Sequence, residues 1–396
     1  MTPTEQELFR VLVGFASLRP VNSLKWPAYS SIQNIHHFLL HSVLLNPHFS
    51  SYPPSTEYQR NFWKWAIENL ETAQRELRPE AGQCLSVSSS KVLRTVLGAA
   101  SNFRTVGAFQ HASVDLLDIH PGLPFGHQPP SDSYVTHYWQ SIPREVLGLP
   151  SSNVFDLSQY TTATLLESRR TVESGTTGLR TWRASFVLAH YLAENPDLIK
   201  NRRVLELGSG IGFLGIVVAS LQLQHTKSSS RNDVGGLYLT DVNEEVLSRC
   251  KNNLILPCNF SSTHPNIHVQ ELDWFASLHC NQSVALASHL EHELRPDIIL
   301  GADILLPKVF DPSLIPALVG VLKIALGKEN TGGNGQRCAF IALTLRNQVT
   351  VEAFLTHVQD ANLGITEVSS GVEYPLMSRA FPDEDVVNLF KITTKQ

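Results

Sequence analysis

Closely spaced glycines interrupt two apolar runs in the segment VLELGSGIGFLGIVVAS, residues 204–220. Glycines between a strand and a helix leave room for a ligand, and the first amides of the helix have no partner inside it. Gly208, Ser209 and Gly210 are therefore candidate ligand-binding residues. The same pattern also suits a turn that only packs a strand against a helix.

The acid in front of these glycines, Glu206, helps to discriminate between ligands. A dinucleotide site holds a pyrophosphate at the helix N-terminus, where a carboxylate would repel it. A cationic ligand suits Glu206 better. S-adenosylmethionine has an ammonium group, a sulfonium group and no phosphate. Glu206 therefore favours a methyl donor over NAD, the alternative that the glycines leave open.

Three later segments end in residues that suit the rest of such a ligand. Asp241 ends LYLTD and can accept hydrogen bonds from ribose hydroxyls, or it can cap the next helix. Asp273 can accept from an adenine amine beside the flat face of Trp274, although a core tryptophan is an alternative. Ala302 is small enough for close approach, and Asp303 follows it. In an open parallel sheet, such strand ends meet at one edge.

Strands and helices alternate in the second half of the chain, which predicts βαβ units and a mainly parallel α/β sheet. We expect strands within residues 202–207, 235–241, 266–273, 295–303, 337–346 and 384–393. We expect helices within residues 180–196, 212–224, 243–256, 313–326 and 350–363. Polar inserts at 226–236 and 327–337 are expected to be loops, and the first lengthens the spacing between the glycines and Asp241.

The first part of the chain, residues 1–120, is predicted to be a helical domain. Apolar residues recur there at helical spacing within 6–18, 31–45, 55–77 and 88–100. Prolines and glycines predict a linker over 121–152. Alternating residues over 154–173 predict strand structure, with a hairpin as one possibility, at the start of a domain spanning 153–396.

Net charge, apolar runs and cysteine content restrict the classes of partner, metal and location that we expect. The net charge of -5 offers no general attraction for nucleic acid, so we expect no direct binding to it. The N-terminus lacks a signal-peptide pattern and the apolar run 317–326 contains Lys323, so we expect no membrane segment. Five scattered cysteines suggest neither disulfides nor zinc, and we expect no metal and a reducing cytoplasmic location.

Several motifs together resemble the seven-β-strand protein-lysine methyltransferases that use S-adenosylmethionine. They are SGTTGLRTWRASFVLAHYLAENPDLIKNRRVLELGSGIGFLGI at 174–216, ELDW at 271–274 and GADILL at 301–306. Within that family the chain is most similar to the group that methylates elongation factor 2. Residues 53–71 also resemble the helical extension of that group.

The resemblance implies a seven-stranded, mostly parallel Rossmann-like sheet with helices on both faces. It also implies a lysine of elongation factor 2 as the acceptor, recognised by the N-terminal domain, and we expect a monomer. The donor-binding positions it implies are Trp182, Gly208, Ser209, Gly210, Asp241, Trp274 and Ala302. Leu306 stands where the family has an aromatic residue, so another residue, with Phe310 a candidate, must wall the lysine channel.

The reaction implied is direct displacement by a neutral lysine amine, with Asp303 orienting the amine as the catalytic residue. Two alternatives stay open: a methyltransferase-fold protein that binds without catalysis, and a small-molecule methyltransferase. The intact set of Glu206, the glycines, Asp241 and Asp303 argues against the first. The extra helical region argues against the second, because a small metabolite needs no such surface.

Overall fold

A computed structural model describes most of the chain. The described residues are 2–76, 132–140, 160–173, 175–225, 234–305, 311, 313–327, 336–368 and 386–395. They fall into two compact units. The first comprises Met1–Ser133 with Leu147–Leu157, and the second comprises Tyr134–Val146 with Ser158–Gln396. The domain boundaries expected from the sequence stay a prediction.

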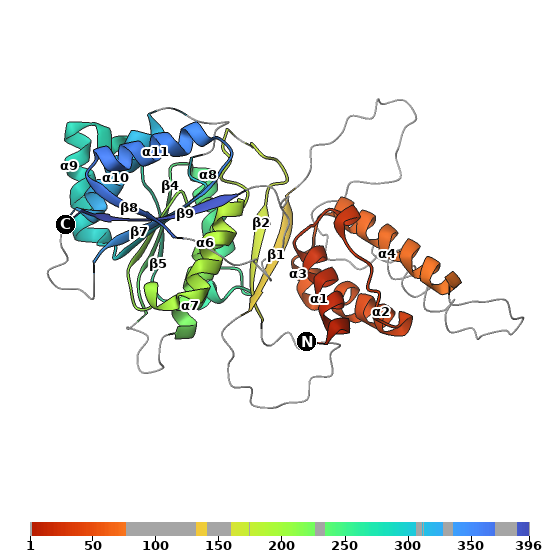
Figure 1. The fold of residues 1–396 in the computed structure, drawn as a ribbon. Coiled ribbons are helices and arrows are strands. Elements are labelled where there is room, and N and C mark those ends of the chain that lie inside the picture. The colour runs from red at the N-terminus through yellow and green to blue at the C-terminus, as the bar shows by residue number, and fades with distance from the viewer. Residues whose placement is uncertain are drawn as a thin grey trace, which may run out of the picture. The chain divides into compact units, whose positions relative to one another are not determined.

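The described part of the first unit is helical (Figure 1, red to orange). Its elements are α1 (Pro3–Ala16), η1 (Val21–Ser23), α2 (Ile32–Phe38), a π-helical turn η2 (Leu39–Leu44), α3 (Pro47–Ser51) and α4 (Thr56–Glu76). Helices expected within 6–18, 31–45 and 55–77 are therefore confirmed. The helix expected at 88–100 lies outside the described residues.

Aromatic side chains form the core of this helical unit. The Phe15 ring lies 5.1 Å from that of Phe49 and 4.6 Å from that of Phe62. The buried Tyr58 hydroxyl donates toward the carbonyl oxygens of Gly14 (3.0 Å) and Arg19 (2.8 Å). These contacts join α1 and α4 and provide the polar partner that a buried tyrosine needs.

The second unit is built on a seven-stranded sheet with the order β5-β4-β3-β6-β7-β9-β8. The strands are β3 (Val204–Leu207), β4 (Leu237–Asp241), β5 (Ile267–Glu271), β6 (Ile298–Ala302), β7 (Cys338–Thr344), β8 (Leu363–Glu367) and β9 (Val387–Thr394). Neighbouring strands from β5 to β7 pair in parallel, and β9 runs antiparallel to β7 and β8. The predicted fold is confirmed, except that β8, a short edge strand with exposed residues, was not expected from its sequence.

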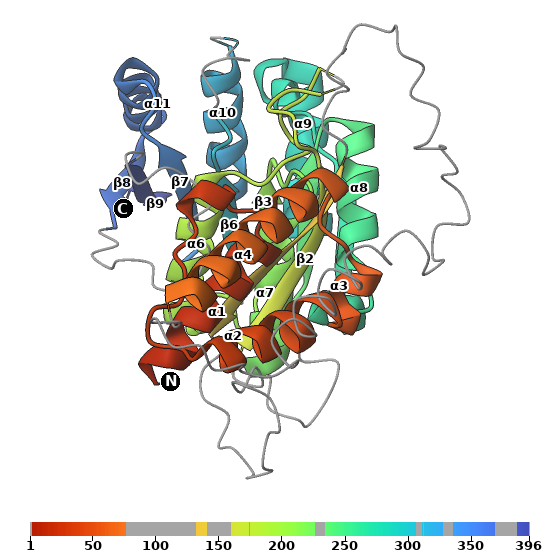
Figure 2. The same cartoon turned by 90° about the vertical axis from the view of Figure 1, so that its right-hand side faces the viewer.

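Helices cover both faces of this sheet (Figures 1 and 2). One face packs against α6 (Arg183–Glu194), α7 (Phe213–His225) and α8 (Glu244–Leu254). The other packs against α9 (Cys280–Ser288), α10 (Leu314–Leu326) and α11 (Gln348–Asp360). Shorter helices are η3 (Pro196–Leu198), η5 (Phe260–Thr263), η6 (Trp274–Leu278) and the π-helical η7 (His289–Leu294). Within the described ranges, no helix combines the length and apolar character needed to cross a bilayer.

A separate two-stranded sheet pairs β1 (Ser133–Gln140) with β2 (Tyr160–Glu167). The strand β1 lies inside the segment 121–152, so a linker over that whole segment was the wrong prediction. Its sequence SYVTHYWQ is rich in β-branched and aromatic residues, a strand composition that the flanking prolines obscured. The described partner of β2 is β1, and a hairpin within 154–173 is not seen in the part described.

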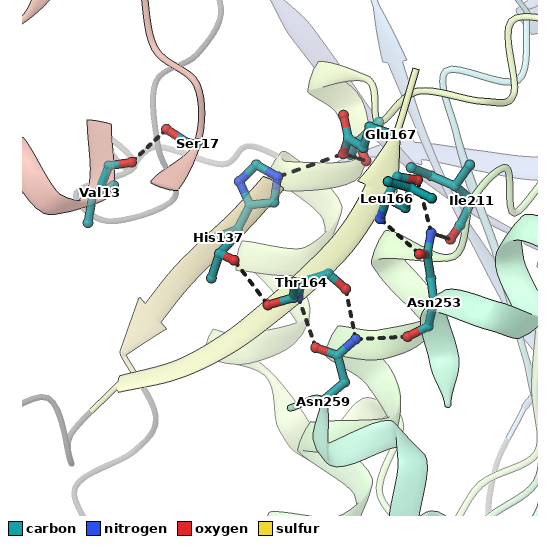
Figure 3. Close-up of polar contacts among 11 residues, drawn as sticks. Val13, Ser17, His137, Thr164, Leu166, Glu167, Ile211, Asn253 and Asn259 are labelled. Atoms are coloured by element: carbon teal, nitrogen blue, oxygen red, sulfur yellow. Dashed lines mark hydrogen bonds and ion pairs between the residues drawn. The ribbon is translucent and has the colours of Figure 1, made fainter. Parts of the chain in front are cut away.

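Two buried asparagines anchor β2 to the helical face of the main sheet (Figure 3). Asn253 accepts a hydrogen bond from the Leu166 amide at 2.9 Å and donates to the Ile211 carbonyl at 3.1 Å. Asn259 accepts from the Thr164 amide at 2.9 Å and donates to the Thr164 carbonyl at 2.8 Å. The side-chain amides thus substitute for a neighbouring strand and satisfy the free edge of β2.

Candidate functional site

The carboxyl ends of β5, β4, β3 and β6 lie side by side at one edge of the sheet. Chain order reverses between β3 and β6, which is where open α/β sheets bind ligands. A cavity of about 260 Å³ opens there. Its lining includes Trp182, Gly208, Ser209, Gly210, Asp241, Asp273, Trp274, Ala302 and Asp303. The structure therefore brings together at one cavity every predicted site residue except Glu206.

The glycine turn after β3 forms the floor of this cavity through its backbone. Gly208 and Gly210 have φ angles of +62° and +53°, a backbone region that residues other than glycine rarely adopt. A Cβ atom at Gly208 would lie 2.8 Å from Ile304, and one at Gly210 would lie 3.0 Å from the Gly178 carbonyl oxygen. The Ser209 hydroxyl donates to the Thr240 carbonyl at 3.2 Å, which ties the turn to the neighbouring strand β4.

Asp241 links the end of β4 to the glycine turn. Its Oδ2 accepts from the Gly210 amide at 3.2 Å, and its Oδ1 accepts from Val242 at 2.8 Å and Asn243 at 3.2 Å. The cap of α8 is Asn243, whose side chain accepts from the Val246 amide, so the helix-cap alternative for Asp241 is wrong. Burial raises the pKa of Asp241, and the three amide donors oppose that rise.

Glu206 lies in the interior beneath the turn, not on the cavity wall. It occupies the centre of β3 and is 3% exposed. Its Oε2 has no hydrogen-bond partner among the described residues. Burial raises the pKa of this carboxyl well above its ordinary value, and the nearby charge of Asp241 raises it further. The Glu206 carboxyl therefore lacks a positive partner among the described residues, and it does not line the cavity.

Asp273 and Trp274 begin η6 at the end of β5. Asp273 is exposed and caps η6 by accepting from the Phe275 amide at 2.9 Å. Trp274 is half-buried, so the alternative of a fully buried core tryptophan is wrong. A Cβ built at Gly208 would lie 3.6 Å from its ring, an ordinary van der Waals distance. Trp274 thus lies beside the glycine turn and lines the cavity.

Asp303 is the most heavily bonded carboxylate of the cavity. It is 6% exposed and has a left-handed φ of +52°. Its Oδ1 accepts from the Thr344 amide at 2.8 Å. Its Oδ2 accepts from the Thr344 hydroxyl at 2.8 Å and from the Ala184 amide at 3.2 Å, and it lies 3.5 Å from the Arg346 guanidinium. Since a carboxylate has about four acceptor positions, one position on Oδ1 is left.

Trp182 stands directly before α6 on the wall of the cavity. Its indole nitrogen donates to the Thr177 carbonyl at 3.0 Å, and the Arg346 guanidinium lies over its ring at 4.7 Å. Sequence reasoning missed Arg346, although it is the last residue of the fifth predicted strand segment, 337–346. It also missed Arg180, which lines the cavity within the quoted TGLRTW segment. Leu306 and Phe310 lie outside the described residues.

The site fits a nucleoside sulfonium that is positively charged at one end. The carboxylate of Asp241 stands where a ribose would meet it, Trp274 offers a face for a base, and the glycine turn leaves space that a Cβ would fill. The buried Glu206 oxygen lacks a partner among the described residues, which favours a cationic ligand nearby. Fold and site together define an α/β domain of the methyltransferase class.

The family follows from comparison with known sequences. A sequence model described as lysine methyltransferase matches residues 163–360, and the chain belongs to that family. S-adenosylmethionine is accordingly its cofactor. Glu206, the glycine turn, Asp241, Trp274 and Asp303 all lie within the matched range.

Two curated relatives extend this similarity. Protein-lysine N-methyltransferase EFM3 from Chaetomium thermophilum is 34% identical over 219 residues, which cover 55% of this chain and 56% of that protein. Protein-lysine N-methyltransferase EEF2KMT from Bos taurus is 32% identical over 217 residues, covering 52% and 58%. The chain therefore spans little more than half the length of the relatives it matches.

Proposed function

We propose that this protein transfers a methyl group from S-adenosylmethionine to the side-chain amine of a lysine in another protein. The observation that supports the proposal most is the cavity at the carboxyl ends of β3 to β6 within the family-matched region. Relatives named as protein-lysine N-methyltransferases support the lysine acceptor. The name of one of them includes EEF2, and elongation factor 2 is the acceptor we propose.

The residues of the chain have separate tasks in this proposal. Asp241 accepts from the ribose hydroxyls, Asp273 accepts from the adenine amine, and Trp274 packs against the base. Gly208, Ser209, Gly210 and Ala302 leave room for the donor. When bound, S-adenosylmethionine supplies a methyl group made electrophilic by the sulfonium charge.

Glu206 has a longer-range task. Glu206 is buried and does not line the cavity, so it acts on the donor through space and not by direct contact. Burial raises the pKa of its carboxyl and favours the neutral form, and a cationic donor nearby would shift the balance toward the carboxylate, which attracts that cation.

The acceptor lysine must lose its proton before it can attack, because a free lysine has a pKa near 10.4. Desolvation in the cavity lowers that pKa. The remaining acceptor position on Oδ1 of Asp303 can then take one N–H of the neutral amine and orient its lone pair. Because this chemistry needs no covalent enzyme intermediate, a nucleophilic triad is not required.

The helical first unit is proposed to recognise the acceptor protein, and the protein is proposed to act in the cytoplasm as a monomer without direct contact to nucleic acid. A binding protein without catalysis and a small-molecule methyltransferase are the competing functions. Neither is favoured by a particular contact within the described residues.

One experiment separates these functions. The purified protein is incubated with methyl-tritiated S-adenosylmethionine and a lysate of cells that lack it. We expect one labelled protein with the size of elongation factor 2 and methyl-lysine in its digest. The Asp241→Ala variant is the control and should give no label. Label confined to small molecules, or none at all with the donor bound, would reject the proposal.

A further inference from the structure

Arg180 occupies a firmly held position on the cavity wall. Its neighbours Leu179 and Thr181 are buried. The carbonyl of Leu179 accepts from the Ser168 amide at 2.9 Å, and the Thr181 hydroxyl donates to Glu167 at 2.6 Å. These bonds tie both sides of Arg180 to the end of β2. Arg180 thus has a fixed backbone and is one of the residues that line the cavity.

More negative than positive side chains line the cavity. Its charged lining residues are Arg180, Asp241, Asp273 and Asp303. Each of the three carboxylates accepts a hydrogen bond from at least one backbone amide. Arg180, by contrast, makes no hydrogen bond or ion pair with any residue that the structure describes. Its five N–H donors are thus unused at the wall of a binding cavity.

An anion that enters this cavity meets three negative side chains and one positive one. Repulsion would keep such a group out unless it lay close to the guanidinium. Arginine binds carboxylates with two parallel hydrogen bonds, a geometry that a lysine ammonium lacks. The side chain on this wall therefore suits a carboxylate.

We infer that Arg180 forms a carboxylate-binding subsite and holds the α-carboxylate at the methionine end of the donor. This inference rests on the proposed function, because it assumes that S-adenosylmethionine fills the cavity. The donor has one negative group, and the cavity lining has one cation among its described residues. Arg180 is two residues from Trp182, a donor-binding position implied by the family resemblance, and both residues line the cavity.

A carboxylate of the acceptor protein, next to the target lysine, has the same chemistry. The donor is favoured because Arg180 lines the same cavity as the glycine turn and Asp241. The two sources differ in their consequences: a donor subsite alters the binding of donor alone, whereas an acceptor subsite alters only the use of the protein substrate.

Calorimetry on the full chain tests the subsite with two ligands, S-adenosylmethionine and its analogue without the α-carboxyl group. We expect the wild type to bind the analogue about tenfold more weakly, about 1.4 kcal/mol. Arg180→Gln should bind S-adenosylmethionine about tenfold more weakly and the analogue as the wild type does. Arg180→Lys should restore part of the loss.

Arg170→Gln is the matched control. Arg170 belongs to the neighbouring segment, pairs with Glu173 at 3.8 Å and does not line the cavity, so its loss should leave both affinities within twofold. Equal weakening of both ligands by Arg180→Gln would overturn the inference. So would an unchanged donor affinity with a raised KM for the protein acceptor. A wild type that binds neither ligand would instead reject the proposed function.

Discussion

The guanidinium of Arg346 lies over the ring of Trp182, 4.7 Å from its centre. The same guanidinium lies 3.5 Å from Oδ2 of Asp303. A cation between an aromatic face and a carboxylate is attracted to both. Arg346 therefore links the indole before α6 to the acid after β6, and it acts as a positioning residue for two sides of the cavity.

Loss of this link should weaken donor binding moderately. Arg346→Ala frees the Trp182 ring, and a cation–π contact at a partly exposed site is worth about 0.5–1 kcal/mol. We expect the Kd for S-adenosylmethionine to rise about two- to fivefold, measured by calorimetry, and Arg346→Lys to recover part of it. Arg337→Ala is the control, because Arg337 precedes β7 and bonds the Ala325 carbonyl. An equal effect of both alanine variants would contradict the positioning role.

Asp303→Ala should abolish methyl transfer while donor binding survives. The substitution removes the acceptor that orients the lysine amine. It also leaves the amides of Ala184 and Thr344 without their partner, at a cost of about 1–3 kcal/mol of unfolding free energy. Single-turnover transfer, calorimetry and thermal unfolding measure the three effects.

Thr344→Val separates these roles of Asp303. It removes one donor to the carboxylate but leaves the carboxylate in place. We expect a comparable loss of stability with transfer retained within about fivefold. Transfer at the wild-type rate in Asp303→Ala would show that the carboxylate is dispensable.

The buried Glu206 should make stability depend on pH. Its folded-state pKa is raised above the ordinary 4.5, so between these two values the folded protein holds one more proton than the unfolded chain. The unfolding free energy therefore falls as pH rises through that window. Glu206→Gln should remove this dependence. Thermal unfolding between about pH 5 and about pH 8 measures it, and identical pH profiles would contradict the assignment.

The glycine turn offers a matched pair of substitutions. Gly210→Ala adds a Cβ at φ +53° and 3.0 Å from the Gly178 carbonyl oxygen, whereas Gly175→Ala adds one at φ +74° with no heavy atom within 4 Å. Both should lose about 1–2 kcal/mol of stability through backbone strain. Only Gly210→Ala should also lower donor affinity, by at least about tenfold, because the turn must shift. Equal donor affinities in the two variants would place the donor elsewhere.

Local patterns predicted most of the sheet and the residues at its edge. Apolar strands with acids or small residues after them stand out because the strand period and the buried position restrict residue choice. Trp274, Asp241 and Ala302 were found by that rule. The strand β8 was not found by this rule, because an edge strand with exposed residues needs no apolar run.

Long-range contacts were beyond prediction. The carboxylate of Asp303 joins β6, β7 and α6 through hydrogen bonds to residues distant in the chain. The sequence near position 303 does not indicate those partners. Glu206 shows the same limit. Its residue type correctly suggests a positive partner, but the strand's alternation directs its side chain into the interior, away from the cavity wall.

The two asparagines that anchor β2 should differ in their effect on the donor (Figure 3). Both are 1% exposed, and loss of either should cost about 1–3 kcal/mol of stability by leaving backbone groups unpaired. Only Asn253 also bonds the Ile211 carbonyl, at 3.1 Å, in the turn that lines the cavity. We therefore expect Asn253→Ala to raise the Kd for S-adenosylmethionine severalfold and Asn259→Ala to leave it within twofold. Calorimetry below the unfolding temperature measures this, and a larger effect of Asn259→Ala would show that β2 influences the cavity by another route.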